Sequence, residues 1–466
     1  MKYGLLGERL GHSLSPAIHE ALGSAPYELY EAGREMLPAF FAARNFAGIN
    51  VTIPYKQAVL PYLDRQDPVS CRTGAVNTIV KEEDGSLSGY NTDYAGFLAA
   101  LDHAGIRVLG RKCLILGSGG ASRTVRAALY DLGAETVVIV SRDPDAAKAA
   151  ALSPISSADG TVQNPAAEAD RAAAGTPCLF CDYQAVYTEH ADAEIVINTT
   201  PVGMYPDCGA SPLALSAFPR LAGVFDLIYN PLRTALLLEA DARGIPCANG
   251  LYMLVAQAAA SSRLFTRVSD HITCPTELVS MQEAGIRKIR AIFGKLLAER
   301  TNLIFIGMPG AGKTTVGALC AKALGRPFAD LDVIFEKEAG MPIPDFFRAY
   351  GESAFRDRES EIASRFGKEG GYVIACGGGA VLREENYAYL KQNGVLIHLT
   401  RPVELLPTDP TRPLSSSREA LREMEKARAP RYARFADLVI ANEGTPLEAA
   451  KKAVSAFSGE MQDSAR

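Results

Sequence analysis

The chain has 466 residues, enough for roughly three domains, and its 48% hydrophobic and 22% charged residues are typical of globular proteins. With 48 Lys and Arg against 53 Asp and Glu, the net charge of −5 excludes the broad positive field that nucleic acids or anionic membranes require. We therefore expect small-molecule partners, no nucleic acid and no membrane. The N-terminus has no apolar stretch of signal-peptide length, and the 9 cysteines are scattered, so we expect a cytoplasmic protein with reduced thiols.

Short apolar strands alternate with longer Ala- and Leu-rich helical patterns along most of the chain, which predicts an α/β fold with parallel sheets. Three stretches interrupt this alternation. Residues 151–178 are small and polar, which predicts a surface insertion. Residues 266–300 end in a predicted helix that is followed by a new strand at 303–306, so we place a domain junction near residue 300. Residues 402–417 are rich in proline, which predicts an irregular loop of the kind that often serves as a lid.

Polar side chains gather in short loop segments of the first hundred residues, where a substrate site is more expected than a core. The segment GHSLSP offers two alternate hydroxyls on one face of an extended turn, which suit a carboxylate or a polyol. NVTIPYK places a lysine just after a strand, while GAVNT and GYNTD add an amide and a carboxylate. The side chains concerned are Ser13, Ser15, Thr52, Lys56, Asn77 and Asp93.

A glycine-rich segment, KCLILGSGGASR, lies between a predicted strand and a predicted helix, as a dinucleotide-binding turn requires. The next strand, TVVIV, ends in Ser141-Arg142-Asp143, at the position that selects the cofactor. Arg142 favours the 2′-phosphate of NADP, whereas Asp143 could accept a hydrogen bond from the free ribose hydroxyl of NAD. Both cofactors therefore remain open from this motif, as does a glycine turn that binds no dinucleotide.

Together with NTTPVGM at 198–204 and GLYMLVAQ at 250–257, these segments resemble shikimate dehydrogenase, from residue 1 to about 290. The resemblance implies that Lys56 and Asp93 are the catalytic pair, with Lys56 exchanging a proton at the substrate oxygen. It implies further substrate contacts at Ser13, Ser15, Thr52, Asn77, Tyr229 and Gln257. It also implies cofactor contacts at Gly117, Gly119, Gly120, Ala121, Arg142, Asn198, Thr200, Met204 and Gly250. The family's Asn-Arg-Thr-x-x-Arg is replaced here by Ser141-Arg142-Asp143-Pro-Asp-Ala146, and NADP is our preference.

The segment GMPGAGKTT at 307–315 matches G-x-x-x-x-G-K-[ST] between a predicted strand and a predicted helix. Loop amides and a helix N-terminus can therefore converge on phosphates. Lys313 would reach the β- and γ-phosphates of ATP, and Thr314 would ligate Mg²⁺. The expected ATP contacts are Gly307, Gly310, Ala311, Gly312, Lys313, Thr314 and Thr315. The DLD segment after the next strand places Asp330 and Asp332 on one face of an extended segment, where one can hold Mg²⁺ through water and the other can accept a proton from a substrate hydroxyl.

The set GMPGAGKT, DLD, FRDRE, CGGG and RP-L resembles shikimate kinase over residues 301–457. The resemblance implies that Asp332 is the base and that Arg412 is the lid arginine beside ATP. It implies shikimate contacts at Asp332, Arg356, Gly377, Gly378, Gly379 and Arg428. The loop LLPTDPTRP is shorter than in the family and lacks the arginine that stacks on adenine there.

These patterns predict three domains: a substrate domain over 1–100 and 240–298, a Rossmann-like NADP domain over 101–239, and a P-loop kinase over 301–466. The predicted reactions are NADPH-dependent reduction of 3-dehydroshikimate to shikimate, followed by MgATP-dependent phosphorylation of shikimate. Two alternatives stay open: an NAD-dependent quinate/shikimate dehydrogenase with a kinase, and a non-catalytic sensor or repressor. The second alternative predicts eroded catalytic positions, whereas Lys56, Asp93 and Lys313 are all present. The oligomeric state remains open.

Overall fold

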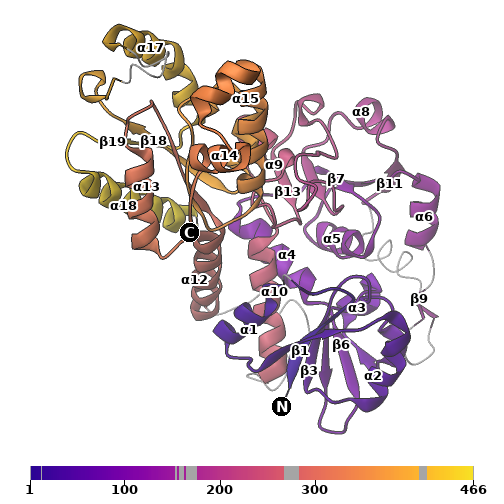
Figure 1. Cartoon of the computed structure of the whole chain (residues 1–466). Helices are drawn as coiled ribbons and strands as arrows, with labels where there is room; N and C mark the ends of the chain where they lie inside the picture. Colours follow the sequence, from indigo (N-terminus) through magenta and orange to yellow (C-terminus); the bar gives the residue numbers. More distant parts are fainter. Residues whose placement is uncertain are drawn as a thin grey trace. The chain divides into compact units, whose positions relative to one another are not determined.

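The computed structural model (Figure 1) describes residues 2–11, 13–152, 155–156, 162–163, 176–266, 283–408 and 417–464. The chain divides into two compact units. The first comprises Met1–Val202, Ser211–Tyr229 and Glu239–Phe293, and the second comprises Gly203–Ala210, Asn230–Leu238 and Gly294–Arg466. Most of the predicted insertion at 151–178 lies outside the described residues. Within them, no helix combines the length and apolar character needed to cross a membrane.

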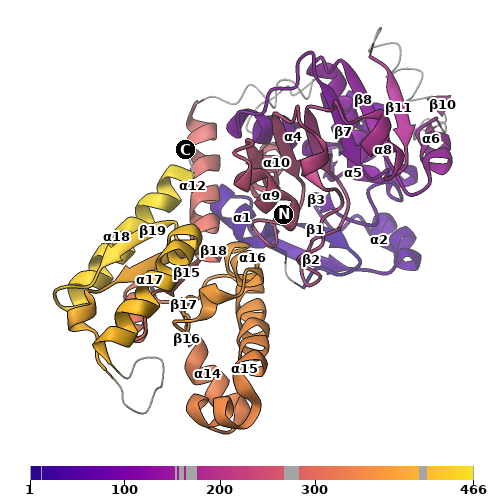
Figure 2. The ribbon, with the colours of Figure 1, turned by 90° about the horizontal axis from the view of Figure 1, so that it is seen from above.

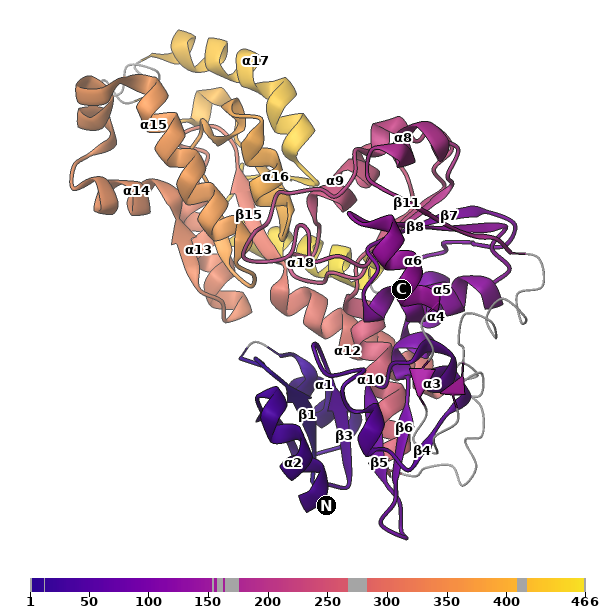
Figure 3. The same cartoon turned by 90° about the vertical axis from the view of Figure 1, so that its right-hand side faces the viewer.

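The first sheet has six strands in the order β2-β1-β3-β5-β6-β4, with both parallel and antiparallel pairs. α10 (Leu251–Thr266) packs along α4 (Thr92–His103) (Figure 3). Ser261 of α10 accepts a hydrogen bond from Asn50 of β3 at 2.8 Å. A segment beyond residue 250 therefore completes the core that begins at the N-terminus. The other elements are β1 (Tyr3–Gly7), β2 (Tyr27–Glu31), β3 (Gly48–Val51), β4 (Arg65–Gln66), β5 (Thr78–Lys81), β6 (Leu87–Tyr90), α1 (Ser15–Leu22), α2 (Leu37–Ala43) and α3 (Pro68–Thr73).

The second sheet is parallel, with six strands in the order β11-β8-β7-β12-β13-β14. This is the doubly wound order. Successive strands are added on one side of β7 and then on the other, and such folds bind ligands at this switch point, between β7 and β12. The strands are β7 (Lys112–Leu116), β8 (Thr136–Val140), β11 (Cys178–Cys181), β12 (Ile195–Asn198), β13 (Gly223–Asp226) and β14 (Cys247–Ala248). The helices are α5 (Gly120–Asp131), α6 (Pro144–Leu152), α8 (Ala185–Glu189) and α9 (Ala235–Ala242), and β9 (Ile155–Ser156) pairs separately with β10 (Val162–Gln163).

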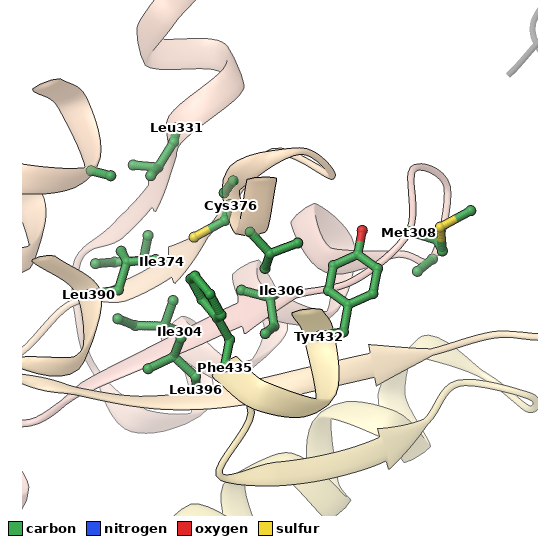
Figure 4. Packing of buried hydrophobic residues seen from close by; sticks show 14 of the residues in the cluster. Ile304, Ile306, Met308, Leu331, Ile374, Cys376, Leu390, Leu396, Tyr432 and Phe435 are labelled. Carbon is green, nitrogen blue, oxygen red and sulfur yellow. The ribbon is translucent and has the colours of Figure 1, made fainter. Parts of the chain in front are cut away.

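The third sheet is parallel, with five strands in the order β16-β17-β15-β18-β19 (Figure 2). Alternate residues of β15 face opposite sides of the sheet: Ile304 and Ile306 pack with Tyr432 and Phe435 on one side (Figure 4), and Phe305 packs on the other. The elements are β15 (Asn302–Ile306), β16 (Phe328–Asp330), β17 (Val373–Ala375), β18 (Gly394–Thr400), β19 (Leu438–Ala441), α13 (Lys313–Leu324), α14 (Leu331–Ala339), α15 (Ile343–Lys368), α16 (Glu385–Lys391), α17 (Arg418–Phe435) and α18 (Pro446–Ser464). Short 3-10 helices are η1 (Arg34–Met36), η2 (Leu60–Tyr62), η3 (Leu215–Ala217), η4 (Ala380–Leu382) and η5 (Val403–Leu405).

The predicted α/β class with parallel sheets is confirmed. The predicted helix before residue 300 is also present, as α12 (Glu283–Arg300), with Ile289, Phe293 and Leu296 buried. Two local predictions are wrong. Ser15 is the first residue of α1 and Leu14 before it is helical, so the described residues Leu14 and Ser15 of this segment are not in an extended turn. Asp332 lies in the first turn of α14 rather than on an extended segment, because the Asp330 side chain caps that helix.

Candidate active sites

Lys56 and Asp93 lie together in the first unit. Lys56 follows β3, Asp93 stands in the first turn of α4, and Lys56 Nζ donates to Asp93 Oδ2 at 2.6 Å. Both side chains are largely buried, with 22% and 16% of their surfaces exposed. The helix N-terminus favours the negative charge of Asp93. A carboxylate held in this way orients an ammonium group that can exchange a proton with a substrate oxygen.

Two more of the expected substrate contacts meet beside this pair. Asn77 Nδ2 donates to Gln257 Oε1 at 3.3 Å, across 180 positions of the chain. Asn77 Oδ1 in turn accepts from the Thr92 amide at 2.7 Å, at the start of the helix that carries Asp93. The sequence analysis missed Asn50, which donates to Ser261 and Thr78 behind Asn77 and accepts from Tyr27. Its place two residues before Thr52 was the signal available.

The other expected substrate contacts are more dispersed. Ser13 and Ser15 follow β1, and Thr52 follows β3; these two strands are parallel neighbours, so their carboxyl ends lie at one edge of the sheet. Ser13 Oγ accepts from the Ser15 amide at 3.2 Å. Tyr229 is half-buried and follows β13.

The expected dinucleotide turn lies at the point where the strand order of the second sheet reverses. Gly117 has a φ of +99°, and a Cβ there would lie 2.8 Å from Thr200 Cγ2 after β12. Asn198 Oδ1 accepts hydrogen bonds from the Thr200 backbone amide at 3.0 Å and from the Thr200 hydroxyl at 2.7 Å. A Cβ on Gly119 or Gly120 would meet nothing within 4 Å, so the start of α5 opens onto free space. This opening fits a pyrophosphate at the helix N-terminus.

Three more residues are expected to contact the cofactor, namely Ala121, Met204 and Gly250. Ala121 lies in the first turn of α5. A Cβ on Gly250 would lie 2.1 Å from the Leu227 carbonyl oxygen, so the backbone approaches too closely there for any other residue. Met204 belongs to the second unit and is 46% exposed.

The two residues that compete over cofactor choice have different surroundings. Asp143 Oδ1 accepts from the Ala146 amide at 2.9 Å and so caps α6, which begins at Pro144. Arg142 is exposed at the end of β8. The Asp-Pro pair was the sequence signal for this cap, because proline favours the first helical position.

The phosphate loop of the second unit follows β15. Lys313 Nζ donates to the carbonyl oxygens of Gly307 at 2.9 Å and Met308 at 3.0 Å. Burial lowers the pKa of Lys313 below its usual range, and the charge of Asp332 opposes this shift. Gly310 and Gly312 have φ values of +78° and +97°, which other residues rarely adopt. These features form the lysine-bearing cradle that a nucleotide phosphate requires.

Thr314 Oγ1 donates to Asp330 Oδ2 at 2.6 Å, and Thr315 follows in the first turn of α13. A hydroxyl and one carboxylate fit Mg²⁺, which binds one or two carboxylates together with substrate phosphates and water. The sequence analysis missed Asn442, whose Nδ2 donates to the Ala311 carbonyl at 2.8 Å and braces the loop.

The expected shikimate-binding residues of the second unit converge after β17. A Cβ on Gly377 would lie 2.6 Å from Asp332 Oδ1, and one on Gly379 would lie 2.2 Å from Arg356 Nη1. Arg428 Nη1 donates to the Gly378 carbonyl at 2.8 Å. The structure therefore brings these carboxylate and guanidinium groups against one glycine turn. Arg412 lies outside the described residues.

The sequence analysis also missed Glu359, which lies three positions after Arg356. Arg356 Nη1 donates to Glu359 Oε2 at 2.6 Å, and the carboxylate is only 4% exposed. Burial raises the pKa of Glu359, against the opposing charge of Arg356. Within the described part of the chain, Glu359 Oε1 is buried without a hydrogen-bond partner, so it can accept from a bound hydroxyl. The R-x-x-E spacing on a helix was the available signal.

Comparison with known proteins identifies both halves. Residues 5–79 match the family model of the shikimate dehydrogenase substrate binding domain, and residues 309–458 match that of shikimate kinase. The shikimate dehydrogenase (NADP(+)) of Moorella thermoacetica is 40% identical over 274 residues, which cover 56% of this chain and 86% of that protein. The chain belongs to the shikimate dehydrogenase family.

A second such dehydrogenase, from Caldanaerobacter subterraneus, is 38% identical, with 57% of this chain and 91% of that protein covered. The crystal structure of Thermus thermophilus shikimate 5-dehydrogenase in complex with NADP(H) and shikimate is 34% identical, covers 62% of this chain and 99% of that chain, and has a TM-score of 0.47. In the present chain, the region of the shikimate dehydrogenase family is followed by a shikimate kinase domain. The predicted fusion of an oxidoreductase with a kinase of the shikimate pathway is confirmed.

Proposed function

We propose that the first unit reduces 3-dehydroshikimate to shikimate with NADPH and that the second phosphorylates shikimate with MgATP. The observation that carries the dehydrogenase reaction is the 2.6 Å contact between Lys56 and Asp93, beside the Asn77–Gln257 pair. NADPH supplies the hydride. Lys56 delivers a proton to the carbonyl oxygen, while Asp93 orients Lys56 and accepts from a substrate hydroxyl. Asn77 and Gln257 offer amide groups for the remaining hydroxyls.

The charges at the end of β8 support NADP. Asp143 Oδ1 is engaged as the cap of α6, at 2.9 Å from the Ala146 amide, which gives this carboxylate a structural role in place of a ribose contact. Arg142 is exposed and offers a guanidinium fork that suits a phosphate. The relatives from Moorella and Caldanaerobacter are both named for NADP(+).

The kinase proposal rests on the glycine turn that joins Asp332, Glu359 and Arg356. ATP supplies the phosphoryl group. Asp332 accepts the proton of the attacking hydroxyl, Arg356 and Arg428 bind the carboxylate, and Lys313 neutralises charge on the phosphates. Thr314 and Asp330 hold Mg²⁺. Because the first product is the second substrate, fusion raises its local concentration near the kinase.

Two reciprocal variants of the full chain test this assignment. Lys56→Ala is expected to lower kcat for NADP-dependent shikimate oxidation by about 10²- to 10⁴-fold, since it removes the proton donor and acceptor, while ATP-dependent phosphorylation of shikimate persists. Lys313→Ala is expected to show the opposite pattern. Each variant is the control for the other, in coupled spectrophotometric assays on one preparation. The assignment would be contradicted if either variant lost both activities, or if either variant kept both.

A further inference from the structure

A polar cluster of Arg72, Tyr94 and Asp131 joins three helices of the first unit. Arg72 at the end of α3 donates to both carboxylate oxygens of Asp131, at 2.9 and 2.5 Å, and the Tyr94 hydroxyl donates to Asp131 Oδ2 at 2.5 Å. The Arg72 guanidinium also lies 5.6 Å from the centre of the Tyr94 ring. Asp131 is the last residue of α5 and Tyr94 lies in the first turn of α4. One carboxylate thus holds α3, α4 and α5 together.

A second tie joins the same helices nearer the start of α5. Asn91 Nδ2 donates to Thr73 Oγ1 of α3 at 2.9 Å and to Thr124 Oγ1 of α5 at 3.0 Å. Thr124 and Asp131 are seven positions apart, so they lie on one face of α5 about 10 Å apart along its axis. Hydrogen bonds at only one of these two positions would allow α5 to pivot against α4. Hydrogen bonds at both positions, about 10 Å apart, fix the direction of the α5 axis.

The two tied helices carry the two halves of the dehydrogenase site. The start of α5 opens at Gly119 and Gly120, where the proposed cofactor would bind. The first turn of α4 carries Asp93, and Tyr94 next to it is only 2% exposed. Hydride transfer requires the reacting atoms to be held about 3 to 3.5 Å apart, and an error of about 1 Å costs about 10²-fold in rate. The direction of α5 relative to α4 therefore controls this distance.

We propose that Asp131 is a positioning residue for hydride transfer, which fixes α5 against α4 through Arg72 and Tyr94. This inference rests on the proposed dehydrogenase function. The side chains of Arg72 and Asp131 are 21% and 35% exposed, so solvent screens part of this ion pair and limits its contribution to stability. Asp131 of α5 accepts from two nitrogens of Arg72 in α3 and from the Tyr94 hydroxyl in α4. One side chain is therefore held from two other helices, as a residue that constrains their geometry must be.

The test uses the full-length Asp131→Ala variant. The rate constant of hydride transfer is measured in single turnovers with NADP and shikimate, with and without deuterium at the carbon that loses the hydride. We expect this rate constant to fall at least tenfold, with an isotope effect that identifies the step, while the KM values for shikimate and NADP change less than about threefold. Tyr94→Phe, which leaves the ion pair intact, is expected to give a smaller fall. Shikimate kinase turnover should not change.

Asp84→Ala is the matched control, because it removes another Arg–Asp pair of the same unit, Arg65–Asp84 at 3.1 Å, which is exposed. It should leave the rate constant unchanged. An unchanged rate constant of hydride transfer in Asp131→Ala overturns the proposal. This holds even if the amplitude of the single-turnover signal falls, because a lower amplitude with the same rate constant reports only a smaller folded fraction. If the unmodified protein transfers no hydride between shikimate and NADP, the proposed function itself fails, so the two failures are distinguishable.

Discussion

At the residue scale, Asp143 shows how a local hydrogen bond changes the meaning of a motif. The carboxylate follows the second strand of the dinucleotide fold, where an acid commonly binds the ribose of NAD. In this chain it accepts from the Ala146 amide at 2.9 Å and caps α6. The neighbouring Arg142 is exposed, so its guanidinium group is open to solvent at this position.

We predict that Arg142→Ala raises the KM for NADP by about tenfold or more, since a hydrogen bond to a charged group contributes about 1.5 to 3 kcal/mol. Asp143→Asn is the control. Asparagine caps helices as well as aspartate does, so the KM values for NADP and NAD should both stay within about twofold. Steady-state kinetics with each cofactor would make this measurement. A switch toward NADP caused by Asp143→Asn would show that the carboxylate selects the cofactor after all.

At the element scale, the glycine turn after β17 brings two carboxylates of the proposed kinase site together. The turn lets Asp332 of α14 and Glu359 of α15 approach one backbone position. Strand β17 lies between β15 and β16 in the sheet, so its carboxyl end lies beside both the phosphate loop and the cap of α14. A side chain at Gly377 would occupy the position between the two carboxylates.

We predict that Gly377→Ala lowers kcat/KM for shikimate phosphorylation by about 10- to 100-fold, because its Cβ would lie 2.6 Å from Asp332 Oδ1 and 2.7 Å from Glu359 Oε1 and overpacking costs about 1 to 3 kcal/mol. Gly459→Ala in α18 is the matched control, since a Cβ there meets nothing within 4 Å. It should leave kinase kinetics unchanged. Equal kcat/KM values for the two variants would rule out the expected role of the turn. Dehydrogenase activity reports whether the chain is intact.

At the scale of the whole molecule, the division between the two compact units falls inside α12, between Phe293 and Gly294. The last turns of this helix belong to the second unit: Leu297 and Ala298 pack against its apolar cluster, and Arg326 donates to the carbonyl oxygens of Ala298 and Thr301. A kinase that started at residue 301 would lack the contacts made by Leu297 and Ala298.

We therefore predict that a fragment of residues 301–466 has a melting temperature about 3 to 10 °C below that of residues 283–466. The estimate combines the apolar contacts of Leu297, which contribute less than the ~1.5 to 3 kcal/mol of a fully buried leucine, with the lost hydrogen bond to Ala298, about 1 kcal/mol, in a domain of this size. Calorimetry on both fragments gives the comparison. Replacement of Leu297 by alanine in the longer fragment should reproduce part of the loss, and equal melting temperatures would refute the contribution of α12.

The sequence alone determined the α/β class, the phosphate loop at 307–315, the glycine turn at 117–120 and the two families, because these depend on short stretches whose backbone conformation is set by neighbouring residues. Single features such as Lys56 and Arg356 were accessible in the same way. Only the tertiary structure decided which distant side chains meet: Asn77 with Gln257, Arg72 with Asp131, and Glu359 with the turn at Gly377. Those contacts depend on strand register and helix packing, which join residues far apart in the chain and leave no local pattern. The cap formed by Asp143 shows the same limit at short range, since one carboxylate can serve a helix or a ligand and its orientation determines which.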